Sequence, residues 1–119
     1  MNNLLLLPEI FKNSSLSLVQ IIKEIIQEKG SSLDLDYAYI KKEIRKNPSI
    51  IDAWIEYSEN KRDSGWYIKI KENNFRVGFI EESFKSVREK EFLKREDACA
   101  FFVQMEVKRL LDIVKSYRQ

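Results

Sequence analysis

The feature that most constrains the fold is an alternating segment in the second half of the chain, GWYIKIKENNFRVGFI, at residues 65–80. Apolar and polar residues alternate through residues 66–71 and again through residues 75–79, a period typical of strands that bury one face. The intervening ENN predicts a tight turn, because asparagine tolerates positive φ angles. The segment therefore predicts an antiparallel β-hairpin. Its buried face is expected to hold Trp66, Ile68, Ile70, Phe75, Val77 and Phe79.

Two segments before the hairpin carry a helical period instead. In residues 14–29, apolar side chains recur every three or four positions, and Ser14 or Ser15 is expected to cap the start. Gly30 is expected at the left-handed position that ends this helix. Residues 36–46 predict a second helix by the same spacing.

Helix boundaries can be predicted on either side of the hairpin as well. Asp34 or Asp36 is the expected N-cap of the second helix, and Pro48 is expected to end it, because the residue before a proline is pushed out of helical dihedral angles. A third, long helix is expected from about Arg95 nearly to residue 119. Acidic residues at 96 and 97 would complement the positive end of its dipole.

Two segments fit more than one structure. Residues 50–58 alternate as a strand does, although Ile50, Trp54 and Tyr57 are also spaced for a helix, and we predict a strand. Residues 84–92 fit either an edge strand or a loop. The predicted fold is therefore α+β: two N-terminal helices, a small antiparallel sheet of three to four strands, and a long C-terminal helix packed on it. The length of 119 residues predicts a single domain, 1–119.

The composition argues against the common kinds of catalytic and metal site. The chain has no histidine and one cysteine, so imidazole bases and cysteine-rich zinc sites are excluded. Cys99 lies in an apolar run and is expected to be a buried, inert thiol. Trp54 and Trp66 fit core packing better than ligand stacking. We therefore expect a protein that is not an enzyme and has no cofactor and no metal site.

The N-terminal segment MNNLLLLPEIF bears on location. It has no basic residue before its leucines and no small-residue cleavage site, so it does not fit a secretory signal. No segment contains the roughly twenty apolar residues of a membrane span. The sequence therefore predicts a cytoplasmic protein with no membrane partner.

Stretches of the second half resemble a known class of protein. The stretches GWYIKI, NNFRVGFIEES and EFLKREDACAFFV resemble the core pattern of bacterial immunity proteins from polymorphic toxin and contact-dependent growth inhibition systems. The chain departs from that pattern at residues 82–83, which are Glu-Ser where related sequences often have Arg-Gly, and at residues 94–95, which are Lys-Arg where a small polar cap is expected. The matching positions are Trp66, Arg76–Glu82, Phe92 and Glu96–Phe102.

The resemblance implies a non-enzymatic inhibitor. Such a protein binds the toxic C-terminal domain of its cognate partner and blocks the active site of that domain or the access of its substrate. The net charge of +2 does not fit a mimic of nucleic acid, so either the interface is a local acidic patch or the toxin is not a simple basic nuclease. We expect the patch, at one end of the sheet. The predicted partner-binding residues are Glu56, Glu59, Arg62, Asp63, Glu81, Glu82, Arg88 and Glu89.

Two other functions remain alternatives. A small nucleic-acid-associated regulator would use the basic cluster at residues 41–46, with Lys41, Lys42, Arg45 and Lys46 on phosphates. The interleaved charges and the pI of about 8.6 favour instead a helix face in water. An enzyme of unfamiliar type is the third alternative, and the absence of a nucleophile–base pair argues against it.

Overall fold

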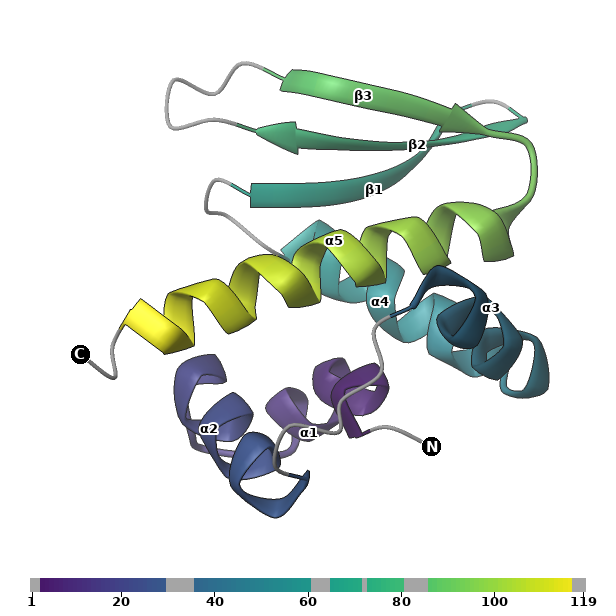
Figure 1. Cartoon of the computed structure of the whole chain (residues 1–119). Coiled ribbons are helices and arrows are strands. Elements are labelled where there is room, and N and C mark those ends of the chain that lie inside the picture. Colours follow the sequence, from purple (N-terminus) through teal and green to yellow (C-terminus); the bar gives the residue numbers. More distant parts are fainter. Residues whose placement is uncertain (1–2, 30–35, 61–64, 72, 81–85, 117–119) are drawn as a thin grey trace.

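A computed structural model of the chain describes residues 3–29, 36–60, 65–71, 73–80 and 86–116, and its fold is α+β (Figure 1). The helical elements are the 3₁₀-helix η1 (Asn3–Leu6), α1 (Leu7–Lys12), α2 (Leu18–Lys29), α3 (Tyr37–Lys46), α4 (Ser49–Asn60) and α5 (Arg95–Ser116). The strands are β1 (Gly65–Lys71), β2 (Asn74–Ile80) and β3 (Ser86–Phe92). The predicted fold class, hairpin and long C-terminal helix are confirmed.

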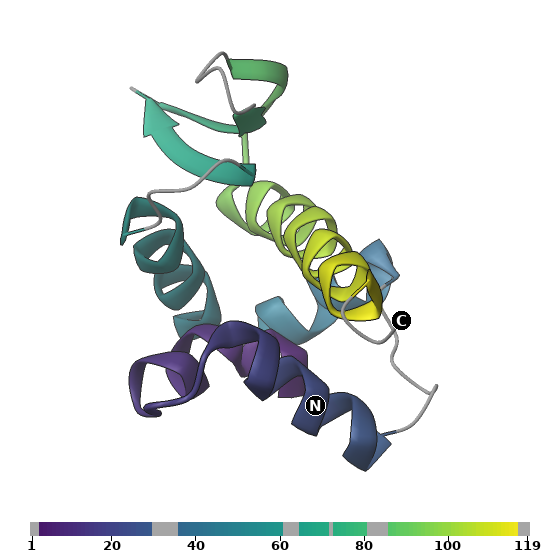
Figure 2. The ribbon, with the colours of Figure 1, turned by 90° about the vertical axis from the view of Figure 1, so that its left-hand side faces the viewer.

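The three strands form one antiparallel sheet in the order β1-β2-β3. In the hairpin, Trp66 pairs with Phe79 and Ile68 pairs with Val77, as the alternation requires. The pairing of β2 with β3 shifts register between Val77 and Phe79. The helices gather on one side of the sheet, and α5 runs beneath it (Figures 1 and 2). Residues 84–92 were expected to form either an edge strand or a loop. β3 lies at an edge of the sheet, so the edge strand is the correct alternative.

The core fills the space among the helices and between α5 and the sheet. Phe102, Val103 and Val107 of α5 are fully buried there. Trp66 of β1 packs edge-on against Phe101, with ring centroids 6.0 Å apart, so an aromatic contact joins the sheet to α5. Within the described residues, no helix is both long and apolar enough to span a membrane.

The outer edge of β1 is closed by a side chain of α4. Ser58 Oγ accepts a hydrogen bond from the backbone N–H of Ile68 at 2.9 Å and donates one to the carbonyl oxygen of Ile68 at 3.1 Å. Ser58 is buried, so this contact satisfies two backbone groups that would otherwise lack partners away from water. The edge of β1 is therefore protected where α4 lies against it.

The prediction of a strand at residues 50–58 is wrong, because the segment forms α4. Ile50, Ile51 and Trp54 are buried at the three- and four-residue spacing of a helix. The indole Nε1 of Trp54 donates a hydrogen bond to the carbonyl oxygen of Leu5 at 2.9 Å, which fixes α4 against the N-terminal segment. Both periods fit this sequence, and tertiary packing selects the helical one.

The helix boundaries also need correction. α2 begins at Leu18 rather than near residue 14, and Ser17 Oγ accepts a hydrogen bond from the N–H of Gln20 at 3.2 Å, so Ser17 is the cap. Asp36 occupies the N-cap position of α3, but its side chain makes no capping hydrogen bond. α3 ends at Lys46, before the proline, as predicted. Asp34 and Gly30, the other proposed caps, lie outside the described residues.

The N-terminal helix and the exposure of Ile70 were not predicted. Residues 7–12 form α1, and Pro8 lies in its first turn. The N–H that proline lacks would have no partner within the helix at this position, so its absence does not destabilise α1. Ile70 was expected on the buried face of the hairpin, but 57% of it is exposed. Toward its end β1 curves away from α5 (Figure 1).

Candidate functional site

The predicted partner-binding residues do not form one described cluster. Of those whose side chains are described, Glu56 and Glu59 lie on α4 and Glu89 lies on β3. Glu56 pairs with Lys12 of α1 at 3.3 Å, whereas Glu89 binds residues of the sheet. Four of the other predicted residues lie outside the described part of the chain: Arg62, Asp63, Glu81 and Glu82. Of Arg88, only the backbone is described.

The strand residues that flank the two undescribed segments, 61–64 and 81–85, nevertheless lie at one end of the sheet. Gly65 pairs with Ile80, and Ile80 pairs with Ser86. The chain therefore enters or leaves residues 61–64 and residues 81–85 at the same end of the sheet. The hypothesis of a charged patch at that end stays a prediction.

Glu89 is the centre of a polar network on the sheet face that points away from the helices. Its carboxylate accepts a hydrogen bond from Tyr67 Oη of β1 and one from Arg76 Nη1 of β2, the second at 3.1 Å. Lys69 Nζ lies 3.7 Å from the same carboxylate and 5.3 Å from the centre of the Tyr67 ring. One acid on an edge strand therefore holds side chains from both of the other strands.

Gly78 makes the reach across the sheet possible. It sits on the central strand directly opposite Tyr67, and a Cβ atom at this position would lie only 2.7 Å from Tyr67 Cζ. The phenol ring thus occupies the space that a side chain at 78 would take, and its hydroxyl passes over β2 to Glu89 on β3. At this position, the absence of a side chain is a geometric requirement of the network.

The surroundings of Glu89 favour its charged form. The hydrogen bond from Tyr67 lowers the pKa of Glu89 from its usual value. Burial opposes this shift, and the nearby charges of Lys69 and Arg76 lower the pKa further. Glu91, two residues along β3, accepts a hydrogen bond from Asn74 of β2. The face is therefore polar, nearly balanced in charge and held in one arrangement by its own contacts.

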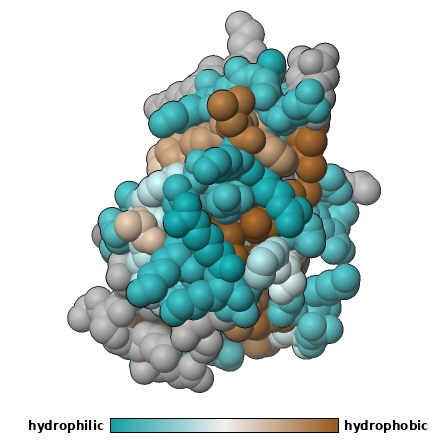
Figure 3. Space-filling model, turned by 90° about the vertical axis from the view of Figure 1, so that its right-hand side faces the viewer, coloured by the Kyte–Doolittle hydropathy of each residue, from teal (hydrophilic) through white to brown (hydrophobic). Residues whose placement is uncertain are grey.

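An exposed apolar end adjoins this polar face. Ile70 near the end of β1 is 57% exposed, and Leu93, which follows β3, is 81% exposed. Figure 3 looks onto the end of the molecule where α5 begins and shows hydrophobic side chains in its upper part, beside a broad hydrophilic area. Ile70 and Leu93 therefore add exposed apolar area beside the polar face.

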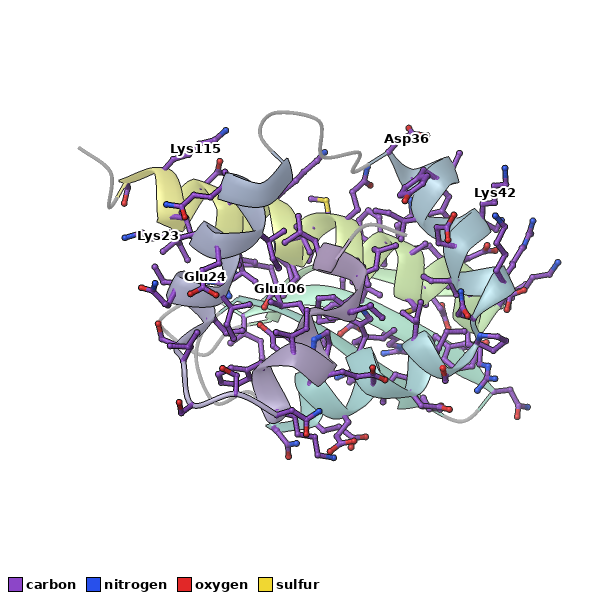
Figure 4. All side chains as sticks on the ribbon, turned by 90° about the horizontal axis from the view of Figure 1, so that it is seen from below. Lys23, Glu24, Asp36, Lys42, Glu106 and Lys115 are labelled. Carbon is purple, nitrogen blue, oxygen red and sulfur yellow. The ribbon has the colours of Figure 1, made fainter. Side chains whose placement is uncertain are left out.

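A second network, buried among the helices, was missed by the sequence analysis. Glu106 of α5 is fully buried, and its carboxylate accepts a hydrogen bond from Tyr57 Oη of α4 at 2.8 Å. Arg109, one turn further along α5, donates from Nε at 2.9 Å and from Nη2 at 3.2 Å. Burial raises the pKa of Tyr57 well above its usual value, and the Glu106 charge adds to this effect. Figure 4 shows Glu106 in the middle of the molecule, whereas Asp36, Lys42 and Lys115 lie at its periphery.

The sequence did contain a signal for this network. Val103, Glu106, Val107 and Leu110 follow the spacing of a buried helix stripe, and an acid on such a stripe requires a partner. Arg109, three residues after Glu106, was the available partner on the same helix. Tyr57 could not have been found in this way, because it comes from a segment that was predicted as a strand.

The remaining candidate residues have structural roles. Cys99 is buried as predicted, and burial raises the pKa of its thiol to about 12. Trp54 and Trp66 are both buried in the core, the interpretation that the sequence favoured. The described residues contain no cluster of three or more cysteine or acidic side chains that could hold a metal ion.

Comparisons with known proteins leave the identity of the chain open. No protein-family model matches it, and no curated protein and no solved structure matches it either.

Proposed function

We propose that this chain is a cytoplasmic immunity protein that binds the toxin domain of a polymorphic toxin or contact-dependent growth inhibition system. Bound there, it would cover the active site of the toxin or block the access of its substrate. The observation that best supports the proposal is the network around Glu89, a preorganised set of side chains on a sheet face that no described helix covers. Inhibition of this kind needs only binding, so no catalytic group is required.

The size of the face indicates how far the interface must extend. Seven residues per strand at about 3.3 Å each give a length of about 20 Å, and three strands at about 4.8 Å give a width of about 15 Å. The projected area is about 300 Å², below the roughly 800 Å² that each partner contributes to a stable interface. A stable complex would therefore also use the ends of the sheet.

The two ends differ in what they offer a partner. Ile70 and Leu93 present apolar area at the turn end, where burial in a partner pocket would anchor the complex. The opposite end is where the undescribed segments with the predicted acids Asp63, Glu81 and Glu82 join the sheet. The polar face between them would set orientation and selectivity, because its charges must be matched by the partner when water is excluded.

The first experiment is affinity purification of the tagged chain from its native host, followed by mass spectrometry. We expect a stoichiometric fragment of a larger secreted protein. That fragment should be toxic when it is expressed alone in a sensitive cell, and co-expression of this chain should restore growth. Recovery of no partner protein at all would contradict the proposal.

Two variants then test the open face. Lys69→Glu reverses a charge that is half exposed and lies 3.7 Å from its acid, and Leu93→Asp changes a side chain that is 81% exposed, so neither should unfold the domain. Both should weaken capture of the partner at least tenfold. Lys42→Glu, on an exposed position of α3, is the matched control and should bind as the wild-type chain does. Wild-type binding by all three variants would place the interface elsewhere.

A nucleic-acid-associated regulator is the second candidate, because α3 places cations around a surface hollow of about 510 Å³. Its cations include Lys41, which pairs with Asp97 at 2.6 Å, and Lys46, which lies 3.7 Å from Glu43, so acids partly neutralise this surface. Binding to DNA or RNA should then weaken steeply with added salt and with Lys42→Glu. Absence of binding at low salt would exclude this candidate.

A further inference from the structure

A groove lies between α1 and α4 on the helical side of the molecule, with a volume of about 620 Å³. This volume is within the range of sites for small organic ligands. Apolar lining comes from Pro8 and Phe11 of α1, Leu18 at the start of α2 and Ala53 of α4. Phe11 is 40% exposed, an unusual state for a phenylalanine that has a neighbouring wall to pack on.

The positive charge of Arg109, which lines the groove, is already matched by the carboxylate of Glu106. Tyr57 and Arg109 line the groove, and both donate hydrogen bonds to the buried carboxylate of Glu106. Arg109 uses two nitrogens on that carboxylate, so its charge is matched from within the protein. An anionic ligand would have to compete with Glu106 for this arginine.

The walls of the groove, in contrast, carry an excess of acids. Glu9 comes from α1, and Asp52 and Glu56 come from α4. Asp52 already lies 3.7 Å from Arg95 of α5, which is outside the lining, and both side chains of this pair are exposed. The other cation in the lining, Lys12, reaches across from α1 to Glu56 at 3.3 Å, with both side chains more than half exposed. Exposed ion pairs of this kind contribute little to stability, so the ammonium group of a ligand can take the place of Lys12 beside Glu56.

We propose that this groove binds a small organic cation, with an aromatic or branched aliphatic body and a terminal ammonium group. The body would rest on Phe11 and Leu18, and the ammonium group would lie among the acids of the two walls. The proposal is independent of the one on the sheet, because the groove is built from helices α1, α2, α4 and α5 and includes no strand residue.

The test is an NMR titration of the full ¹⁵N-labelled chain with 2-phenylethylamine. The reporters are the backbone amides of Ala53 and Tyr57, which line the groove, together with the indole N–H of Trp54, the residue after Ala53, which donates to Leu5. We expect these signals to shift and saturate with a dissociation constant of about 1 mM, as is usual for a fragment of this size. The matched probe 3-phenylpropionate has the same ring and chain but a carboxylate, and it should bind at least tenfold more weakly.

Variants of the chain make the test specific. Glu56→Gln should weaken the amine about fivefold, whereas Glu24→Gln, an exposed acid of α2 outside the lining, should leave the affinity unchanged. Ala53→Leu narrows the groove without a change of charge and should abolish the shifts, while the remaining spectrum shows whether the chain is folded. Equal binding of the two probes, an equal effect of the two glutamine variants, or no saturable shift at the groove would each overturn the proposal.

Discussion

Removal of Arg109 should destabilise the fold more than removal of the acid that it binds. In Arg109→Met, the carboxylate of Glu106 stays fully buried and keeps only the donor from Tyr57 among the contacts described above. In Glu106→Leu, the buried charge is gone and Arg109, whose side chain is a quarter exposed, can turn toward water. The two variants break the same contact but leave very different groups behind.

The magnitude follows from burial and distance. Two unit charges about 4 Å apart attract by about 4 kcal/mol at an effective dielectric constant of about 20, and the cost of desolvation offsets much of this gain. Loss of one partner of a buried pair costs about 3–5 kcal/mol, because the other charge is left uncompensated. Since Arg109 is partly exposed and water already screens the pair, we expect about 2–3 kcal/mol for Arg109→Met.

The assay is a double-mutant cycle by urea unfolding, followed by the fluorescence of the two buried tryptophans. In a parallel thermal scan, we expect Arg109→Met to lower the melting temperature by about 8–12 °C. Glu106→Leu should cost about 1 kcal/mol, chiefly through the lost acceptor of Tyr57. The double variant should be more stable than Arg109→Met alone, because no buried charge remains. Lys108→Met, an exposed neighbour on α5, should change stability by less than about 0.5 kcal/mol.

Two outcomes would refute this reasoning. Arg109→Met could match the Lys108→Met control, which would mean that Glu106 does not depend on the arginine. The double variant could equal the sum of the two single losses, which would mean that the two side chains contribute independently. Either result would mean that the Glu106–Arg109 pair does not stabilise the helical core.

Three further perturbations probe other contacts. Gly78→Ala should cost about 1–2 kcal/mol in thermal unfolding, because its Cβ would meet the Tyr67 ring, and the loss should disappear in a Tyr67→Ala background. Ser58→Ala should cost about 1–3 kcal/mol and speed hydrogen exchange at the Ile68 amide, since two buried backbone groups lose their partner. Burial raises the pKa of Cys99 from 9.0 to about 12, so stability present below pH 9 should fall as the pH rises toward 12, and iodoacetamide should label the thiol at pH 9 only after unfolding.

The sequence predicted those elements whose period is unambiguous. Trp66, Ile68 and Val77 alternate with polar residues, and only a strand gives that pattern a buried face. Residues 50–58 fit both periods, and the choice depended on contacts with Leu5 and the rest of the N-terminal segment, which no local pattern contains. The helix was therefore missed for a tertiary reason rather than through weak propensity.

The sequence predicted that the candidate site would be charged, but it did not predict which residues contact one another there. Glu89 was predicted as a partner-binding acid at one end of the sheet, and its contacts depend on the pairing of β2 with β3, which the sequence does not specify. Arg76 lies directly opposite Glu91, yet its hydrogen bond goes to Glu89, two residues along β3. Diagonal contacts of this kind follow from the register shift after Val77 and from the twist of the sheet.

Gly78 connects the register to the network. A side chain at this position would separate Tyr67 from Glu89, and the strands on either side of β2 would then carry two unrelated polar groups. Without one, a phenol from one edge strand and a carboxylate from the other meet above the central strand, so one hydrogen bond joins the two edges of the sheet. If this face binds a partner, Gly78→Ala should reduce affinity in proportion to the loss of that order, even at temperatures where the domain stays folded. Unchanged affinity in that variant would mean that the partner recognises the individual charged side chains of the face and does not depend on their arrangement.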